Sequence, residues 1–272
     1  MRKPVPMKFV LRLLFLLIPV FANAQTSTTN AKTQPGTDSL VLPSVTRDWT
    51  ATEFQEVFKY ILSKQKDSST FIRFDDNKPL FAKLIDIKSY WFLESKAITV
   101  NERIPLNLAM VGYIQKVFFN YYLKSRITNG KLKYEKEVGV FYCLLLEMAE
   151  NQIILTDEFI KTHANLTSVQ LDGIKQMNQG IISSVAGTLT TLEKEYTYFS
   201  EAMICSIARI FSGFYATAYS RIDAGTKTEF DKRIAIIIKQ HSLSCIRTAL
   251  QKAPAKQPMH GEKPANKNTR NT

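Results

Sequence analysis

An apolar run without any charged side chain lies at the middle of the chain, VGVFYCLLL at residues 138–146. The residues around it extend the run into a predicted helix from about Tyr134 to Asn151. Because the run is longer than two helical turns, this helix is apolar on nearly all of its faces. Such a helix is stable in water only when other helices cover it on every side. We therefore expect it to be the central helix of a bundle.

Amphipathic helices are predicted on both sides of this central segment. Thr50 and Glu53 have the spacing of a capping box, and apolar residues then recur at helical spacing from Phe54 to Leu62. Further helices are expected at about 77–92, 105–126, 156–163, 168–197, 200–220 and 228–251. We find no sustained alternation that predicts a strand. The expected fold is all-α, an irregular bundle of six to eight helices over residues 47–251.

The composition of the 272-residue chain limits its class. The hydrophobic fraction of 45% excludes wholesale disorder, and ten glycines and ten prolines exclude a collagen-like or proline-rich chain. The net charge of +12 is unevenly distributed. Residues 1–24 carry four of these charges and residues 252–272 a net four, which leaves four for residues 25–251. This small excess does not favour a basic groove on the folded body.

Both ends of the chain differ from the body. Residues 1–24 combine a basic start, an apolar stretch and the sequence Ala22-Asn23-Ala24, the order of a secretory signal peptide. Residues 25–46, rich in Thr, Ser, Asn and Pro, predict a flexible leader. We therefore expect cleavage after Ala24 and export to the periplasm or the exterior of a Gram-negative bacterium.

The C-terminal residues 252–272 predict a disordered basic tail. Such a tail can contact an anionic surface, such as lipid head groups. It lacks the interleaved aromatic residues that stack on bases, so we do not expect nucleic acid to be a partner. Its basic residues are Lys252, Lys256, Lys263, Lys267 and Arg270.

Three cysteines occur, Cys143, Cys205 and Cys245, all within apolar segments. In an oxidising compartment they can form one disulfide and leave one free thiol. They can equally remain three buried thiols that act as small apolar side chains. The sequence leaves both alternatives open.

Recognisable catalytic motifs are missing. The chain has no glycine-rich phosphate loop, no Gly-x-Ser-x-Gly, no His-Glu-x-x-His and no Cys-x-x-Cys. Glu147 and Glu150, with His163 nearby in sequence, are the residues that could serve a hydrolase through acid–base or metal-assisted chemistry. The simpler interpretation is that these acids form the solvated end of the central helix.

One pair of residues has the spacing of metal ligands. His241 and Cys245 are four residues apart, on one face of the predicted helix 228–251. A closed zinc site needs four ligands, which Cys143 and Cys205 would have to complete. Because the pair continues the apolar stripe of the helix, we expect core packing, and we predict no metal or other cofactor.

Residues 202–219 carry a single charge, Arg209, and could be mistaken for a membrane span. Small residues recur along this segment and along the preceding predicted helix. Such stripes allow two backbones to approach closely, so we expect segments 168–197 and 200–220 to pack as an antiparallel hairpin. The stripes are Gly180, Ser184, Gly187 and Thr188 on one side, and Ala208, Ser212 and Ala216 on the other.

Together these features favour an exported, non-enzymatic helical protein. Aromatic-rich helix faces suit binding, so we expect a scaffold or accessory subunit that binds another envelope protein. One alternative is a hydrolase that uses the cluster between Glu147 and His163. Another is an accessory subunit of an envelope-spanning transfer or secretion machine.

Overall fold

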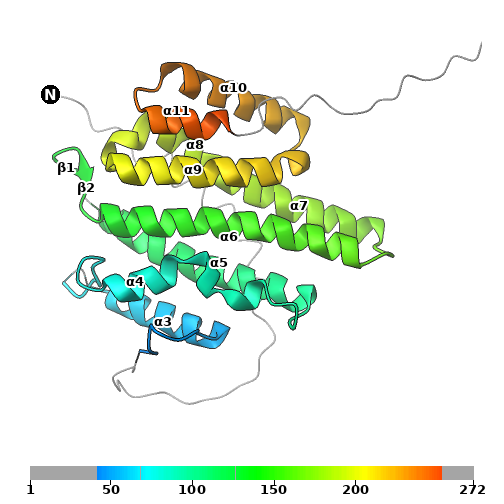
Figure 1. Ribbon diagram of the computed structural model, residues 1–272, viewed down its shortest axis with the longest axis horizontal. Helices are drawn as coiled ribbons and strands as arrows, with labels where there is room; N and C mark the ends of the chain where they lie inside the picture. Colours follow the sequence, from blue (N-terminus) through cyan, green and yellow to red (C-terminus); the bar gives the residue numbers. More distant parts are fainter. Residues whose placement is uncertain (1–41, 68, 126, 253–272) are drawn as a thin grey trace, which may run out of the picture.

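The computed structural model describes residues 42–67, 69–125 and 127–252, and these form an all-α fold (Figure 1). The signal peptide 1–24, the leader up to residue 41 and the tail from residue 253 lie outside the described residues. Within the described part, eight α-helices have eight residues or more, which confirms the predicted bundle. They are α3 (Ala51–Lys64), α4 (Lys78–Ile85), α5 (Val100–Lys124), α6 (Glu135–Thr162), α7 (Ser168–Val185), α9 (Glu201–Ala218), α10 (Ala224–Gln240) and α11 (Ser244–Gln251).

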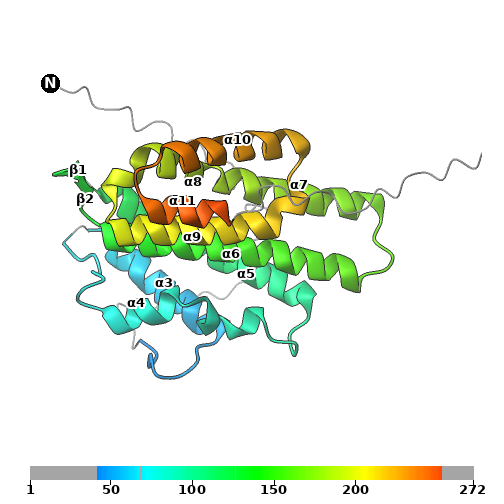
Figure 2. The same cartoon turned by 45° about the horizontal axis from the view of Figure 1, so that its top comes forward.

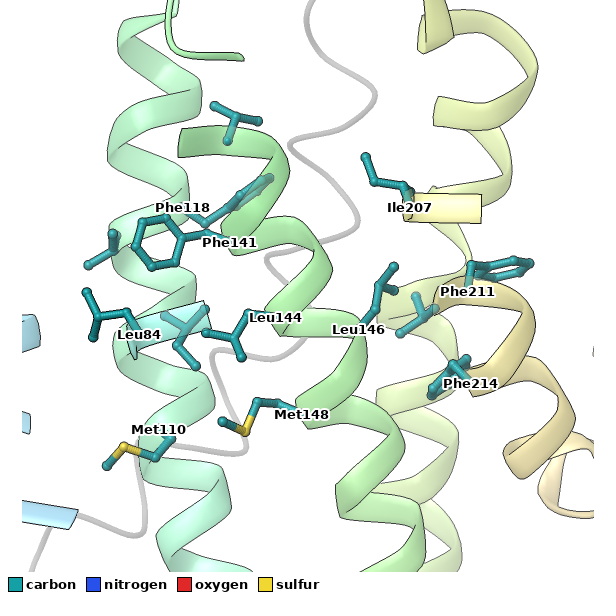
Figure 3. Packing of buried hydrophobic residues seen from close by; sticks show 14 of the residues in the cluster. Leu84, Met110, Phe118, Phe141, Leu144, Leu146, Met148, Ile207, Phe211 and Phe214 are labelled. Carbon is teal, nitrogen blue, oxygen red and sulfur yellow. The ribbon is translucent and has the colours of Figure 1, made fainter. Parts of the chain in front are cut away.

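The apolar run lies in the N-terminal half of α6, and this helix lies between α5 and α9 in both views (Figures 1 and 2). Phe141 and Leu144 point toward α5, whereas Leu146 points toward Phe211 of α9 (Figure 3). Among the described residues, only α6 has the length and composition to cross a membrane, and 50% of that stretch is buried inside the fold. The predicted central helix is thus confirmed, with apolar partners on two sides.

The N-terminal helices α3 and α4 cover one side of the α5–α6 pair. The capping box of α3 is present: Glu53 donates its backbone N–H to the Thr50 hydroxyl and its carboxylate accepts the Thr50 N–H. Even the end of the predicted leader contacts this layer, since Leu42 and Val45 pack against the core.

Several predicted helix boundaries were wrong. The helix predicted at 77–92 ends at Ile85, because Asp86 is extended and its carboxylate accepts the Lys88 N–H, which starts a 3-10 turn at Ile87–Ser89. A second 3-10 turn follows at Trp91–Leu93. The helix predicted from residue 105 begins at Val100, because an overlooked capping box of Thr99 and Glu102 starts it.

A tight hairpin follows the end of α5, with Asn129-Gly130 as its turn. Both residues have positive φ, 52° and 77°, and they join β1 (Ile127–Thr128) to β2 (Lys131–Leu132). Asn-Gly is favoured in two-residue hairpin turns for this reason. The helices predicted at 134–151 and 156–163 are in fact one helix, α6.

The last predicted helix, 228–251, is two helices. His241 and Leu243 have extended backbones, and the Leu243 N–H binds the His241 side chain at Nδ1 (3.0 Å) instead of continuing the helix. This local hydrogen bond competes with the helical one and turns the chain, so that α11 folds back onto α9. The predicted helix 168–197 is also divided, although Ala186 at the end of α7 keeps helical backbone angles. It becomes α7, α8 (Gly187–Thr190), a π-helical turn at Thr191–Glu195 and a 3-10 turn at Tyr196–Tyr198.

The predicted close seam between segments 168–197 and 200–220 was also wrong. The main partners of α9 are α6 and α11 rather than α7. Gly139 of α6 lets Met203 approach the α6 backbone, and on the opposite side the Ser212 hydroxyl donates to the Ala249 carbonyl of α11 (2.8 Å). Ala216 is exposed. The small residues of α9 therefore admit α11, which the sequence pattern did not reveal.

A substitution at Ser212 tests this corrected seam. Ser212→Leu should lower the free energy of unfolding by ~1–3 kcal/mol, because the larger side chain forces α11 away and removes the bond to Ala249. The melting temperature should fall on the order of 2–4 °C per kcal/mol. Ser212→Ala, which removes only the hydroxyl, should cost less. Thermal unfolding measures the stability of both variants. An unchanged melting curve for Ser212→Leu would contradict the packing of α11 against Ser212.

Candidate ligand-binding cavity

An apolar cavity lies among α5, α6 and α7 and has a volume of about 70 Å³. Most of the lining residues of each helix are three or four positions apart, so each helix presents one face to the cavity. None of the twelve lining side chains is charged. They are Leu108, Val111, Gln115 and Phe118 of α5, Tyr142, Leu145, Leu146, Ala149 and Gln152 of α6, and Ile181, Ser184 and Val185 of α7.

A buried amide network lies beside the cavity. The Asn107 side chain, fully buried, donates its Nδ2 hydrogens to the Gln152 Oε1 (2.8 Å) and to the Met148 carbonyl (3.1 Å). Its Oδ1 accepts a hydrogen bond from Asn151 (3.1 Å). These bonds hold Gln152 in one orientation, because Oε1 is the only atom of its amide that can accept.

The same network leaves the other end of the Gln152 amide free. Gln152 is 1% exposed, and its Nε2 has no hydrogen-bond partner among the described residues. A buried donor without a partner costs ~1–3 kcal/mol, and such groups are rare in folded proteins. Gln152 is one of the residues that line the cavity, and its Nε2 is itself enclosed by the protein.

Tyr142 lines the cavity at a level of α6 about 15 Å from Gln152, since ten residues separate them at a rise of 1.5 Å each. Its hydroxyl donates to the Thr188 hydroxyl (2.9 Å). Burial raises the pKa of Tyr142 to about 12, so the phenol stays neutral at physiological pH. The wall therefore gains no charge from this residue.

The arrangement suits binding rather than chemistry. A cavity of this volume holds about five to seven water-sized groups. Its walls offer mainly apolar contacts. The lining residues do not include a cysteine, a histidine or a carboxylate that could act as nucleophile or general base.

The predicted hydrolase residues are not brought together. Glu147 and His163 are sixteen residues apart on or beside α6, which separates them by about 24 Å along the helix. Glu147 is half-buried near Arg209, and burial raises the pKa of its carboxyl. The Glu150 carboxylate accepts a hydrogen bond from the Thr217 hydroxyl of α9 (2.6 Å). The His163 ring stacks on Phe159 (4.1 Å between ring centres).

The predicted metal-ligand pair does not share a helix face. His241 lies between α10 and α11, whereas Cys245 is in the first turn of α11 and forms a disulfide with Cys205 of α9 (Cα–Cα 5.6 Å). Cys143 keeps a free thiol, and burial raises its pKa to about 12. Of the two cysteine alternatives, the structure therefore has one disulfide and one free thiol. Glu201 lies next to this disulfide, but the two sulfurs bind each other.

The buried His241 predicts a pH dependence of stability. Burial holds the pKa of His241 below its usual value, and the Arg247 charge lowers it further. The unfolded chain therefore binds a proton at pH values where the folded protein does not. The free energy of unfolding should fall as pH decreases below ~6.5, until the folded pKa is reached.

Urea unfolding between pH 7.5 and pH 5 measures this effect. His241→Gln should flatten the dependence in that range, because the titrating imidazole is gone. His163→Gln, which changes a histidine at the end of α6, should leave the slope as in the wild type. If the free energy of unfolding depended on pH with the same slope in all three proteins, His241 would not be the source of the pH dependence.

Comparisons of this chain with protein-family models, with curated proteins and with solved structures found no match. The functional interpretation therefore depends on the residues themselves. Gln152 and the cavity were not predicted from the sequence. The available signal was weak: a single glutamine on the face that Tyr142, Leu145 and Ala149 form.

Proposed function

We propose that this chain is an exported, non-enzymatic helical protein that binds a small apolar ligand in the cavity among α5, α6 and α7. The observation that carries the proposal is the cavity itself, whose twelve lining side chains are all uncharged and mostly apolar. Pockets with mostly apolar walls and a few polar groups are typical of small-molecule sites.

Methyl-labelled protein titrated with n-hexane tests whether the cavity takes an apolar guest. The methyl signals of Val111, Leu145 and Val185 should shift, whereas that of Val57 in α3 should not. Ala149→Phe, which fills the cavity, should abolish the shifts. Ala216→Phe, the same change at an exposed site on α9, should preserve them.

A second filling variant guards against misfolding of the first. Ser184→Leu enters the same cavity from α7 and should also abolish binding. The proposal is contradicted if hexane shifts no lining methyl in the wild type, or if filled variants that keep their fold respond as the wild type does.

Export forms the other half of the proposal, and the order of segments in residues 1–24 supports it. N-terminal sequencing of the protein from the envelope fraction should begin at Gln25. Recovery of chains that start at Met1 from the cytosol would contradict export.

A second candidate function is a scaffold or accessory subunit that binds another envelope protein. Two exposed apolar side chains at the start of α7 support it. Val169 is 79% exposed and Leu171 is 42% exposed. Cross-linking in the native host should then capture one defined partner, and Val169→Asp should reduce the yield. Equal yields for Val169→Asp and the wild type would count against this surface.

A further inference from the structure

The disulfide between α9 and α11 places a carboxylate beside two sulfur atoms. Cys205 lies in the second turn of α9, Cys245 lies in the first turn of α11, and Glu201 precedes Cys205 by one helical turn. The Glu201 carboxylate and the two sulfurs lie within 4.8 Å of one another. Thiolates and carboxylates are both zinc ligands. The group therefore has the chemistry of a metal site whenever the two sulfurs are not bonded to each other.

Solvent reaches this disulfide. Glu201 is exposed, and both Cys205 and Cys245 are half-buried. Thiol–disulfide exchange begins with attack of a thiolate on a sulfur, so accessible disulfides are the ones most readily reduced. A dithiol reductant can therefore open the bond. Its two thiols become a disulfide, and each of the two cysteines gains one electron and one proton.

Contacts other than the disulfide also hold α11 against α9. Ile246 and Leu250 of α11 are fully buried in the core. The Ser212 hydroxyl of α9 donates a hydrogen bond to the Ala249 carbonyl (2.8 Å). Since these contacts do not involve the sulfurs, they persist in the reduced protein. The two thiols therefore stay neighbours after reduction.

The spacing of the three groups fits zinc. Ligand atoms that bind zinc at about 2.0–2.3 Å lie no more than about 4.6 Å apart, and the three groups are already enclosed within 4.8 Å. Two zinc-bound sulfurs are about 3.8 Å apart in a tetrahedral site, a separation that rotation of the two cysteine side chains can reach. The N-terminus of α11, where no side chain caps the helix, stabilises negative charge on Cys245.

We propose that reduction of the Cys205–Cys245 disulfide creates a zinc site, in which the two thiolates and the Glu201 carboxylate bind the metal and water takes the fourth position. The two thiols release their protons when zinc binds. Zinc and the disulfide exclude each other, so the metal replaces the covalent link between α9 and α11. The site lies apart from the cavity, whose lining comes from α5, α6 and α7.

Cobalt, which has the coordination chemistry of zinc and a visible spectrum, tests the site. Wild-type protein is reduced with dithiothreitol, freed of reductant under argon and titrated with Co²⁺. It should bind one ion per chain, with thiolate-to-cobalt charge-transfer absorption in the near ultraviolet, and Zn²⁺ should displace the cobalt. Oxidised wild type should show no such absorption. Reduced Cys143→Ser should behave as the reduced wild type, because Cys143 is the free thiol outside the site.

Substitutions at the three positions test the ligand assignment. Cys205→Ser, Cys245→Ser and Glu201→Gln should each weaken Co²⁺ binding at least about tenfold. Glu229→Gln, the same change at an exposed position on α10, should leave the affinity unchanged. The comparison of reduced with oxidised wild type does not depend on any variant folding. Absence of the charge-transfer absorption from the reduced wild type, equal absorption in the oxidised protein, or wild-type affinity in Glu201→Gln would overturn the inference.

Discussion

Removal of the Cys205–Cys245 disulfide is expected to lower the free energy of unfolding by about 4 kcal/mol. The two cysteines are 40 residues apart in sequence, and closing a loop of that length reduces the entropy of the unfolded chain by this amount in the chain-entropy model. For a domain of this size the melting temperature should fall by roughly 8–16 °C. Thermal unfolding of Cys205→Ser with and without reductant measures the effect.

Matched cysteine changes separate the disulfide from simple loss of a thiol. Reductant should destabilise the wild type about as much as the substitution does, and it should have little further effect on Cys205→Ser. Cys143→Ser should leave the effect of reductant intact, because Cys143 is the free thiol. A wild type that unfolds identically with and without reductant would contradict the α9–α11 link.

Arg73→Leu is expected to destabilise the fold by about 3 kcal/mol. The Arg73 Nε binds the Glu137 carboxylate (2.9 Å), and Glu137 is 1% exposed. Breaking a buried pair costs ~3–5 kcal/mol because a charge stays buried without its partner. The low end applies here, since Arg73 is 40% exposed and the Phe74 N–H also binds Glu137 (2.8 Å). Denaturant unfolding gives the value.

The double variant Arg73→Leu/Glu137→Leu provides the control. It removes both charges, so it should recover much of the stability that Arg73→Leu loses. Equal instability of the single and double variants would show that the lost energy comes from other contacts of Arg73, such as the guanidinium above the Tyr134 ring (4.9 Å).

Local signals predicted the fold class and most helix starts. The charge-free run at 138–146 lies in the N-terminal half of α6 and is largely packed against other helices, and the capping box at Thr50 begins α3. The helix expected from residue 168 likewise begins at Ser168, where Thr167 caps α7 with Gln170. These features were predictable because a cap or an apolar run acts within a few residues of itself.

The helix partners could not be predicted in the same way. A stripe of small residues, such as Ala208 and Ser212, shows that a backbone can approach but not which one. The break at His241 depends on a hydrogen bond from the Leu243 N–H to the imidazole. Helical periodicity continued across it from Ile234 to Cys245, so the pattern predicted one helix where two exist.

The cavity was still harder to predict, because it is a space that three helices leave between them. Its residues are ordinary apolar side chains that also occur in well-packed cores. The orientation of the Gln152 amide depends on Asn107, 45 residues earlier, whose Nδ2 donates a hydrogen bond to the Gln152 Oε1. Sequence spacing contains no sign of that contact.

The central claim, that the cavity holds a ligand in the living cell, is tested most directly by mass spectrometry of protein purified gently from the native envelope. The wild type and Ala216→Phe should each release the same small apolar molecule, at close to one molecule per chain. Ala149→Phe, with the cavity filled, should release none. Wild-type protein that carries no small molecule above the level found with Ala149→Phe would contradict the account.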